Sequence, residues 1–353
     1  MKSLYIHIPF CNKICSYCDF AKFNKNNKWV DRYLISLKEE INKNYQGELL
    51  KTIYIGGGTP SSLNMNQLKE LFNILKVLNI GPDYEFTFEC NIEDINEDLL
   101  VLLKDNKVNR LSIGIQSFNK KILKVLGRET NVNINEKILI AKKHFKNINV
   151  DFIYGVFDTD INDLKEDLDK FYNLDINHIS IYALILEDNT LLKVNNYKEL
   201  DEDVQRDMYD FIRNYLKEKG YTHYEISNFA KEGYESIHNL TYWNNEEYYG
   251  FGLGASGFIS KIRYENTRNL NKYLDGNHIL ESHVLNENEN MENEMILGLR
   301  KINGVNKEKF HLKYNKKIEE VFDVKKLKEN KDYYYIDSNE LFISNSILID
   351  FIS

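Results

Sequence analysis

The sequence of 353 residues predicts an α/β protein built around a parallel sheet. Six short runs are rich in β-branched and aromatic residues, and stretches with helical periodicity lie between them. Strands and helices that alternate in this way, at roughly 25 to 50 residues from strand to strand, form βαβ units. Six units are fewer than the eight of a closed barrel, so the pattern fits either a partial (β/α)6 barrel or a doubly wound sheet.

The expected strands and helices follow in order along the first 220 residues. Asn64 is expected to cap a helix that carries Leu68 and Leu71 on one face, and Pro82 predicts a turn. Asp201 is expected to cap a further helix, which Gly220 ends. The expected strands lie at residues 4–8, 52–55, 85–90, 110–115, 149–153 and 178–184.

The pattern changes after Gly220. The next stretch is dense in Tyr, Trp, Asn and Gly, an acidic Asn-rich stretch follows at 281–294, and the remainder consists of short amphipathic segments that end in a Tyr-rich hairpin-like stretch. We therefore expect a barrel at 1–220, an aromatic and Gly-rich extension at 221–280, and a small C-terminal α+β domain at 281–353.

Composition excludes several classes of protein. The net charge of −8 disfavours nucleic-acid binding, which needs a basic surface. No apolar run reaches the roughly 18 residues of a membrane span. The first ten residues lack the apolar core and cleavage site of a secretory signal. The sequence therefore predicts a cytoplasmic protein without a membrane span and without a nucleic-acid partner.

Three of the four cysteines lie in one short segment. Cys11, Cys15 and Cys18 have the spacing C-x3-C-x2-C, directly after the first expected strand. Three thiolates in one loop can hold three irons of a [4Fe–4S] cluster and leave the fourth iron open. The alternative is a structural zinc site, which would take its fourth ligand from His7, Asp19 or the distant Cys90.

A glycine stretch, Gly-Gly-Gly-Thr-Pro at 56–60, follows the second expected strand. Bare glycines allow a ligand to approach the backbone closely, and a phosphate-binding loop would also need Gly-Lys-Ser/Thr, which is missing. Together with the cysteine loop, this stretch resembles the radical S-adenosylmethionine (SAM) superfamily. The resemblance implies a partial (β/α)6 radical SAM barrel in which the glycines receive the amino group of SAM.

Further residues at strand ends match the superfamily pattern in order and spacing. Glu89 and Gln116 offer a carboxylate and an amide, and Arg128 offers a guanidinium that can pair with a carboxylate. The residues that the resemblance assigns to SAM binding are Tyr5, Tyr17, Gly57, Gly58, Thr59, Glu89, Gln116, Arg128, Asp151 and Ala183.

Within the superfamily, the sequence resembles the oxygen-independent coproporphyrinogen III oxidase group along nearly the whole chain. One branch of that group oxidatively decarboxylates two propionates of coproporphyrinogen III, and has a fourth cysteine two residues after the third and an N-terminal arm. Here that position is Phe20, and Tyr5 lies close to the N-terminus. Both departures favour the other branch, the haem chaperones (HemW). The matching stretches are 5–11, 56–60, 110–118, 151–155 and 224–229.

Residues 238–243, His-Asn-Leu-Thr-Tyr-Trp, match the H-N-x-x-Y-W motif associated with haem in that branch. The resemblance implies His238 as an axial iron ligand, with Tyr242 and Trp243 packing on the porphyrin. His7 and His223 are the alternative ligands. The resemblance also implies an unknown haem-acceptor protein and an electron donor such as flavodoxin or ferredoxin. The competing hypothesis is an enzyme, coproporphyrinogen III dehydrogenase.

Overall fold

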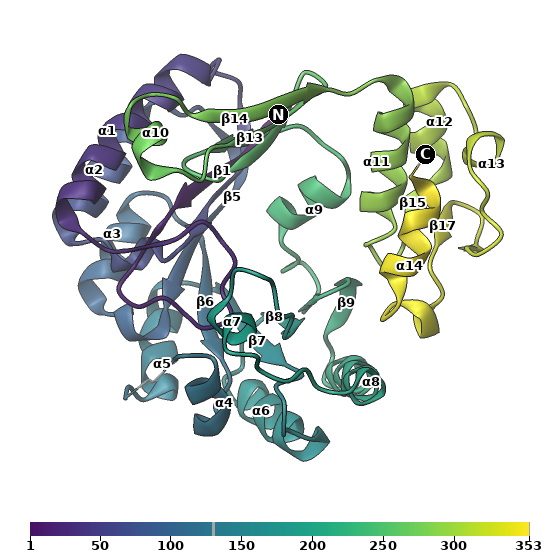
Figure 1. The fold of residues 1–353 in the computed structure, drawn as a ribbon, viewed down its shortest axis with the longest axis horizontal. Helices are drawn as coiled ribbons and strands as arrows, with labels where there is room; N and C mark the ends of the chain where they lie inside the picture. The colour runs from purple at the N-terminus through teal and green to yellow at the C-terminus, as the bar shows by residue number, and fades with distance from the viewer. Residues whose placement is uncertain (129–130, 353) are drawn as a thin grey trace.

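A computed structural model describes residues 1–128 and 131–352, and Figure 1 shows its ribbon. Within these residues the main sheet has twelve strands, in the order β14-β13-β12-β11-β1-β4-β5-β6-β7-β8-β10-β9. The six strands expected from the sequence lie next to one another and run parallel, so the predicted α/β fold with a six-unit barrel is confirmed. They are β1 (Lys2–Ile8), β4 (Leu50–Gly57), β5 (Ile80–Asn91), β6 (Arg110–Gln116), β7 (Asn147–Tyr154) and β8 (His178–Ala183).

Helices connect these strands and cover the outside of the sheet (Figure 1). The expected cap at Asn64 is confirmed, because its side chain accepts from the backbone of Gln67 while the Gln67 side chain accepts from the backbone of Asn64. The connecting helices are α1 (Asn27–Asn44), α2 (Met65–Ile74), α3 (Glu97–Asp105), α4 (Lys120–Val125), α5 (Ile134–His144) and α6 (Ile161–Asn173). No helix in the described part of the chain is long and apolar enough to cross a membrane.

The segment after β8 returns to the sheet at both of its edges. Helix α8 (Glu202–Glu218) is capped by Asp201, as expected, and α7 (Leu191–Val194) precedes it. Strands β10 (Asn228–Ala230) and β9 (Thr222–Glu225) add to the edge beside β8. Strand β11 (Tyr248–Phe251) pairs parallel to β1 at the other side, so residues of the aromatic segment complete the barrel wall there. Beyond β11 lie β12 (Ser256–Ile259), β13 (Ile262–Asn266), α10 (Leu270–Leu274) and β14 (Ile279–Val284).

The C-terminal segment begins at α11 (Glu287–Gly298), which Asn286 caps with a reciprocal bond to Glu289. The Tyr-rich stretch forms the expected hairpin, because β16 pairs antiparallel with β17. In Figure 1 this segment stands beside the barrel, with α9 (Ile237–Trp243) between the two. Its other elements are β15 (Val305–Asn306), α12 (Lys307–Tyr314), α13 (Ile318–Val321), β16 (Lys328–Glu329), β17 (Tyr333–Tyr335) and α14 (Ser344–Leu348).

The turn expected at Pro82 is wrong, because β5 runs through this residue. The strand tolerates the proline through an irregularity: Leu50 pairs with Ile80, but the next pair is Thr52 with Glu85. Proline has no N–H for a ladder hydrogen bond, so it is confined to positions where the ladder is already interrupted.

The two faces of the central sheet differ in polarity. On β1, Leu4, Ile6 and Ile8 are buried in the apolar core, and Ser3 and His7 alternate with them. The same alternation places Thr52, Glu89 and Arg110 on the inner face, where all except the half-buried Glu89 are withdrawn from water. The barrel interior is therefore lined with polar groups that can bind a polar ligand.

Candidate functional site

A cavity of about 410 Å³ lies at the carboxyl ends of the parallel strands. This is the edge where α/β sheets bind their ligands, because the loops that follow the strands converge there. The structure brings twelve of the predicted site residues to its wall. They are Cys11, Cys15, Cys18, Tyr17, Gly57, Gly58, Thr59, Glu89, Gln116, Arg128, Asp151 and Ala183.

The cysteine loop leaves β1 through Pro9 and closes on itself. Its two short strands, β2 (Phe10–Cys11) and β3 (Phe23–Asn24), pair parallel, and the Phe23 N–H donates to the Pro9 carbonyl at 2.7 Å. All three thiols are free, and Thr59 Oγ1 donates to Cys11 Sγ at 3.6 Å. Burial raises the pKa of Cys11 to about 11, so its thiolate forms only when a positive charge such as iron is bound beside it.

The three thiols are not gathered around a single point. Among the described residues, no group of three His, Cys, Asp or Glu side chains is placed to hold one metal ion. A [4Fe–4S] cluster takes each thiolate on a different iron, so it does not need the sulfurs to converge. A zinc ion needs all its ligands within about 2.3 Å of one centre.

The glycine stretch packs directly against the cysteine loop. Gly57 has φ +115°, which side chains rarely adopt, and a Cβ there would lie 2.6 Å from the His7 ring. A Cβ on Gly58 would lie 2.9 Å from the backbone N of Phe10 and 3.0 Å from Cys11 Sγ. The glycines are therefore required for the strand end and the cysteine loop to meet.

Glu89 lies beneath the glycine stretch. Its two carboxylate oxygens accept from the Tyr54 hydroxyl at 2.7 Å and from the Gly57 N–H at 3.0 Å. Burial, with a contribution from the charge of Asp151, raises the pKa of Glu89 to about 7, although the hydrogen bonds oppose this. A cationic group of a ligand would stabilise the ionised carboxylate here.

Arg128 brings a positive charge to the same cavity. Its Nη1 donates to Asn91 Oδ1 at 3.0 Å and to the Gly114 carbonyl at 3.4 Å, while Nε is buried and has no hydrogen-bond partner among the described residues. A buried donor without a partner costs stability, and because this atom has almost no accessible surface, a ligand could reach it only if the side chain moved. A cavity lined by both a carboxylate and a guanidinium suits an amino acid.

The remaining predicted residues of this cavity lie deeper or at strand ends. Asp151 accepts from Ser112 Oγ at 3.1 Å and from Asn149 Nδ2 at 2.8 Å, and burial raises the pKa of its carboxyl group. Gln116 ends β6 with φ +70°, and Ala183 ends β8. These residues supply hydrogen-bonding groups and a small surface beside the charged walls.

Tyr5 does not line the cavity with the other predicted residues. Its hydroxyl lies 2.9 Å from His7 Nδ1, and its ring lies 6.0 Å from that of Tyr54. His7 Nε2 in turn lies 2.8 Å from the Ala21 carbonyl. Tyr5 therefore lies behind the cavity wall, in contact with Tyr54 of that wall and with His7.

The three residues of the predicted haem motif lie on α9, away from this cavity. His238 is buried, with Nδ1 at 2.7 Å from Thr52 Oγ1 and Nε2 at 2.7 Å from the Tyr242 hydroxyl. Burial lowers the pKa of His238 to about 3, so the imidazole is neutral. Its ring stacks on Tyr54 at 5.1 Å. Trp243 is half-buried, and the Arg300 guanidinium lies 5.7 Å from its ring.

Several cavity residues were not predicted from the sequence. Tyr54, Asn91 and Gly114 line the inner wall, and Phe20 and Ile185 line the cavity with 66% and 64% of their surfaces exposed. Tyr54 could have been predicted from the alternation of side chains along β4, because Tyr54 and Gly56 lie on the same face as the polar Thr52. Phe20 lies in the cysteine loop and Ile185 follows the end of β8, and neither segment carries a comparable pattern in the sequence.

Comparisons with known proteins agree with this geometry. The model of the radical SAM superfamily matches residues 5–171. The heme chaperone HemW of Lactococcus lactis is 42% identical over 91% of this chain and 87% of its own length, and that of Bacillus subtilis is 39% identical over 91% and 89%. The crystal structure of coproporphyrinogen III oxidase (HemN) from Escherichia coli, a radical SAM enzyme, aligns with a TM-score of 0.87 at 21% identity, over 99% of this chain and 89% of that chain. The superfamily implies a [4Fe–4S] cluster and SAM, and the chaperone relatives imply haem.

Proposed function

We propose that this chain, which belongs to the HemW family of the radical SAM superfamily, is a haem chaperone that binds haem and passes it to an acceptor protein. The observation that carries the proposal is the similarity to named heme chaperones over nine-tenths of the chain, combined with Phe20 at the position of a fourth cysteine. The acceptor is a protein whose identity the proposal leaves open.

Cys11, Cys15 and Cys18 would hold the cluster, which supplies one-electron chemistry and an open iron when it is bound. The free thiols and the cradle made by Gly57 and Gly58 fit such a group. An electron donor such as flavodoxin or ferredoxin would reduce it.

SAM would occupy the cavity of about 410 Å³ beside the cluster loop. Glu89 would bind the ammonium, and the Arg128 guanidinium, which also lines the cavity, would pair with the carboxylate. The other residues of this site would be Tyr17, Thr59, Gln116, Asp151 and Ala183 along the wall, with Tyr5 acting through its contacts with His7 and Tyr54.

His238 would be the axial ligand of the haem iron, with Tyr242 and Trp243 beside the porphyrin. Its neutral imidazole is the form that binds iron. Both of its ring nitrogens are hydrogen-bonded, so ligation requires the contact with Tyr242 or with Thr52 to break. Haem binding by this route therefore involves a movement of the His238 side chain.

The second candidate function is coproporphyrinogen III dehydrogenase, which the fold shared with the E. coli oxidase favours. The same cluster and SAM residues would serve it. Against it stands Phe20, a side chain that carries no metal ligand, where the enzyme branch has a cysteine.

The experiment that separates the two functions is an anaerobic assay of the cluster-loaded chain with SAM, a reductant and coproporphyrinogen III. The chaperone proposal expects no protoporphyrinogen, together with stable haem binding by the same preparation. Formation of protoporphyrinogen over many turnovers would contradict it and would support the dehydrogenase.

A further inference from the structure

A second hollow, larger than the cavity at the cysteines, lies between the barrel and the C-terminal segment. It has a volume of about 1070 Å³, and one wall includes Leu240 of α9 and Asn244, which directly follows that helix. Lys2 and Thr222, which begin β1 and β9, lie at its floor, so it opens at the amino ends of the strands, opposite to the cysteine cavity. We call it the α9 groove.

The α9 groove has apolar as well as charged walls. Its apolar side chains come from the barrel and from the C-terminal segment, so a flat apolar ligand would be covered from both sides. They are Leu240, Phe258, Ile302, Val305 and the rings of Tyr224 and Tyr333.

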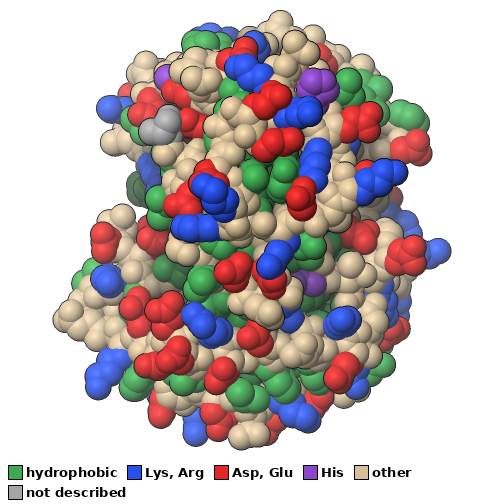
Figure 2. Space-filling model, turned by 90° about the vertical axis from the view of Figure 1, so that its right-hand side faces the viewer, with side chains coloured by type: hydrophobic (Ala, Val, Ile, Leu, Met, Phe, Trp, Pro, Cys, Tyr) green, Lys and Arg blue, Asp and Glu red, His purple; other side chains and the backbone are tan. Residues whose placement is uncertain are grey.

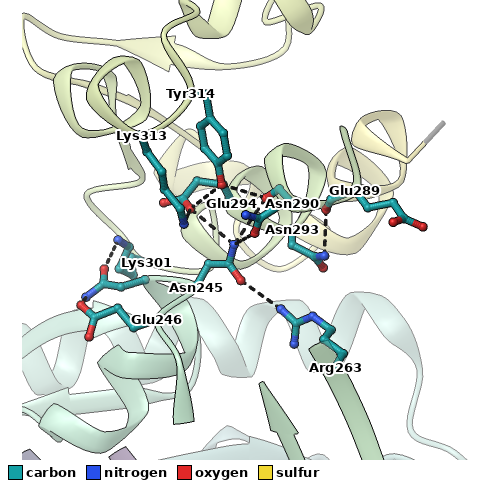
Figure 3. A network of polar contacts seen from close by, with 11 residues as sticks. Asn245, Glu246, Arg263, Glu289, Asn290, Asn293, Glu294, Lys301, Lys313 and Tyr314 are labelled. Atoms are coloured by element: carbon teal, nitrogen blue, oxygen red, sulfur yellow. Dashed lines mark hydrogen bonds and ion pairs between the residues drawn. The ribbon is translucent and has the colours of Figure 1, made fainter. Parts of the chain in front are cut away.

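Lys301 is the unusual group in this groove. Its Nζ donates to Asn244 Oδ1 at 2.6 Å, and Asn244 Nδ2 donates to Glu246 Oε1 at 3.5 Å (Figure 3). Within residues 1–128 and 131–352, the Lys301 ammonium forms no ion pair, although the side chain is largely withdrawn from water. Burial lowers its pKa to about 8. The charges of Glu294 and Glu246 favour this ammonium, but neither carboxylate is in ion-pair contact with it, so an anion bound directly to Lys301 would stabilise it further.

Two of the neighbouring lysines are ion-paired, unlike Lys301. Lys2 pairs with Glu247, and Lys313 pairs with Glu294 at 2.6 Å. On the face in Figure 2, Lys and Arg side chains are likewise interspersed with Asp and Glu. Lys309, on α12, also faces the groove and has no ion pair in the described part of the chain. Lys261 also lines the groove without an ion pair in the described part of the chain, so at least three cations are available to a ligand.

A polar network holds the two walls of the groove together. Asn245 donates to Asn290 Oδ1 at 2.9 Å and accepts from Arg263 Nη2 at 3.0 Å, and Tyr314 donates to Glu294 at 3.2 Å (Figure 3). Asn290 and Glu294 belong to α11, and Asn245 directly follows α9. The position of Lys301 relative to α9 is thus fixed before any ligand binds, which lowers the entropic cost of binding.

We propose that the α9 groove binds the propionate carboxylates of haem, with Lys301 and Lys309 as their partners. This inference rests on the proposed function, because it assumes that the chain binds haem. Haem combines an apolar macrocycle with two carboxylates, which match the apolar walls and the lysines that form no ion pair in the described part of the chain.

The groove and the haem motif are connected through α9. Asn244, which orients Lys301, follows His238 by six residues, and at about 1.5 Å per residue the two lie about 9 Å apart along the helix axis. His238 faces Thr52 and Tyr54 rather than the groove, so it could ligate the iron of a haem held there only after its side chain had left those contacts. His223 lines the groove itself.

The test compares haem with haem dimethyl ester, which has the same macrocycle but no free carboxylate. Both are titrated into the full-length, cluster-loaded chain and followed by the Soret band. We expect the unmodified chain to bind haem roughly 100-fold more tightly than the ester, because a charge-assisted hydrogen bond is lost with each of the two carboxylates. Lys301→Gln should remove most of this preference, and Lys301→Arg should retain it.

The matched control is Lys307→Gln, a neighbouring lysine that does not line the groove and pairs with Glu329. It should leave both affinities unchanged. If the unmodified chain binds haem and ester equally well, the groove assignment is wrong while the haem-binding function stands. If the unmodified chain binds neither, the groove assignment and the proposed function both fail.

Discussion

Replacing Glu89 with Gln should stabilise the ligand-free chain at neutral pH. Burial raises the pKa of Glu89 from 4.5 to about 7, so ionising it costs about 3 kcal/mol more in the folded than in the unfolded chain. A Gln amide can keep its oxygen on the Gly57 N–H and turn its nitrogen toward the Tyr54 hydroxyl, which rotates to accept.

The direction in which stability changes with pH follows from the raised pKa of Glu89. Below pH 4.5 the carboxyl group is protonated in both states, and between pH 4.5 and 7 the folded chain holds the proton that the unfolded chain has released. The stability of the wild-type chain therefore falls as the pH rises through this window. Urea unfolding should show a gain for Glu89→Gln that approaches about 3 kcal/mol at pH 8 and shrinks toward zero near pH 4.5.

The same substitution should weaken SAM binding, because the ionised carboxylate is the proposed partner of the ammonium. We expect a loss of tenfold or more, and a wild-type affinity that rises with pH between about 6 and 8 while the variant shows no such rise. Calorimetric titration of the cluster-loaded proteins measures both.

Glu225→Gln is the matched control. Glu225 is also buried, burial raises its pKa to about 7, and it lies outside the cysteine cavity. It should show a similar gain in stability without a change in SAM affinity. Unchanged SAM affinity in Glu89→Gln, or an equal loss in both variants, would refute the role given to Glu89.

Three further predictions concern the other parts of the site. Cys15→Ala should lower bound iron and sulfide in an anaerobic preparation without weakening haem binding; a full complement of cluster would exclude this cysteine as a ligand. His238→Ala should weaken haem binding at unchanged cluster content, whereas Thr52→Val, which removes a hydroxyl partner of the same imidazole, should bind haem normally; equal losses would indicate a structural role. Gly57→Ala should reduce both SAM affinity and thermal stability, since its Cβ would meet the His7 ring at 2.6 Å and its φ is +115°; an unchanged melting temperature would contradict this reading.

The order of strands and the cysteine cavity could be predicted from the sequence because they depend on local patterns. Each of the six strands combines β-branched residues with a functional residue at or near its carboxyl end, as with Glu89 on β5 and Gln116 on β6. Parallel strands bring these ends to one edge, so residues far apart in sequence meet there. The caps at Asn64 and Asp201 depend on local hydrogen bonds and were predicted for the same reason.

Other features depend on long-range pairing that no local pattern encodes. The parallel contact of β11 with β1 joins residues more than 240 positions apart, and Pro82 enters β5 only because the register shifts there. The α9 groove depends on where the C-terminal segment packs. The hydrogen bonds of His238 to Thr52 and Tyr242 likewise appear only once α9 lies against β4.

The most direct test of the account is an anaerobic haem titration of the full-length chain carrying its cluster, with haem-free cluster-loaded protein as the reference. A haem chaperone should show a saturable Soret change at a fixed haem-to-protein ratio, and the bound haem should leave the protein when a haem-free acceptor is added. A Soret change that never saturates, or haem that stays with the chain in the presence of every acceptor, would contradict the account.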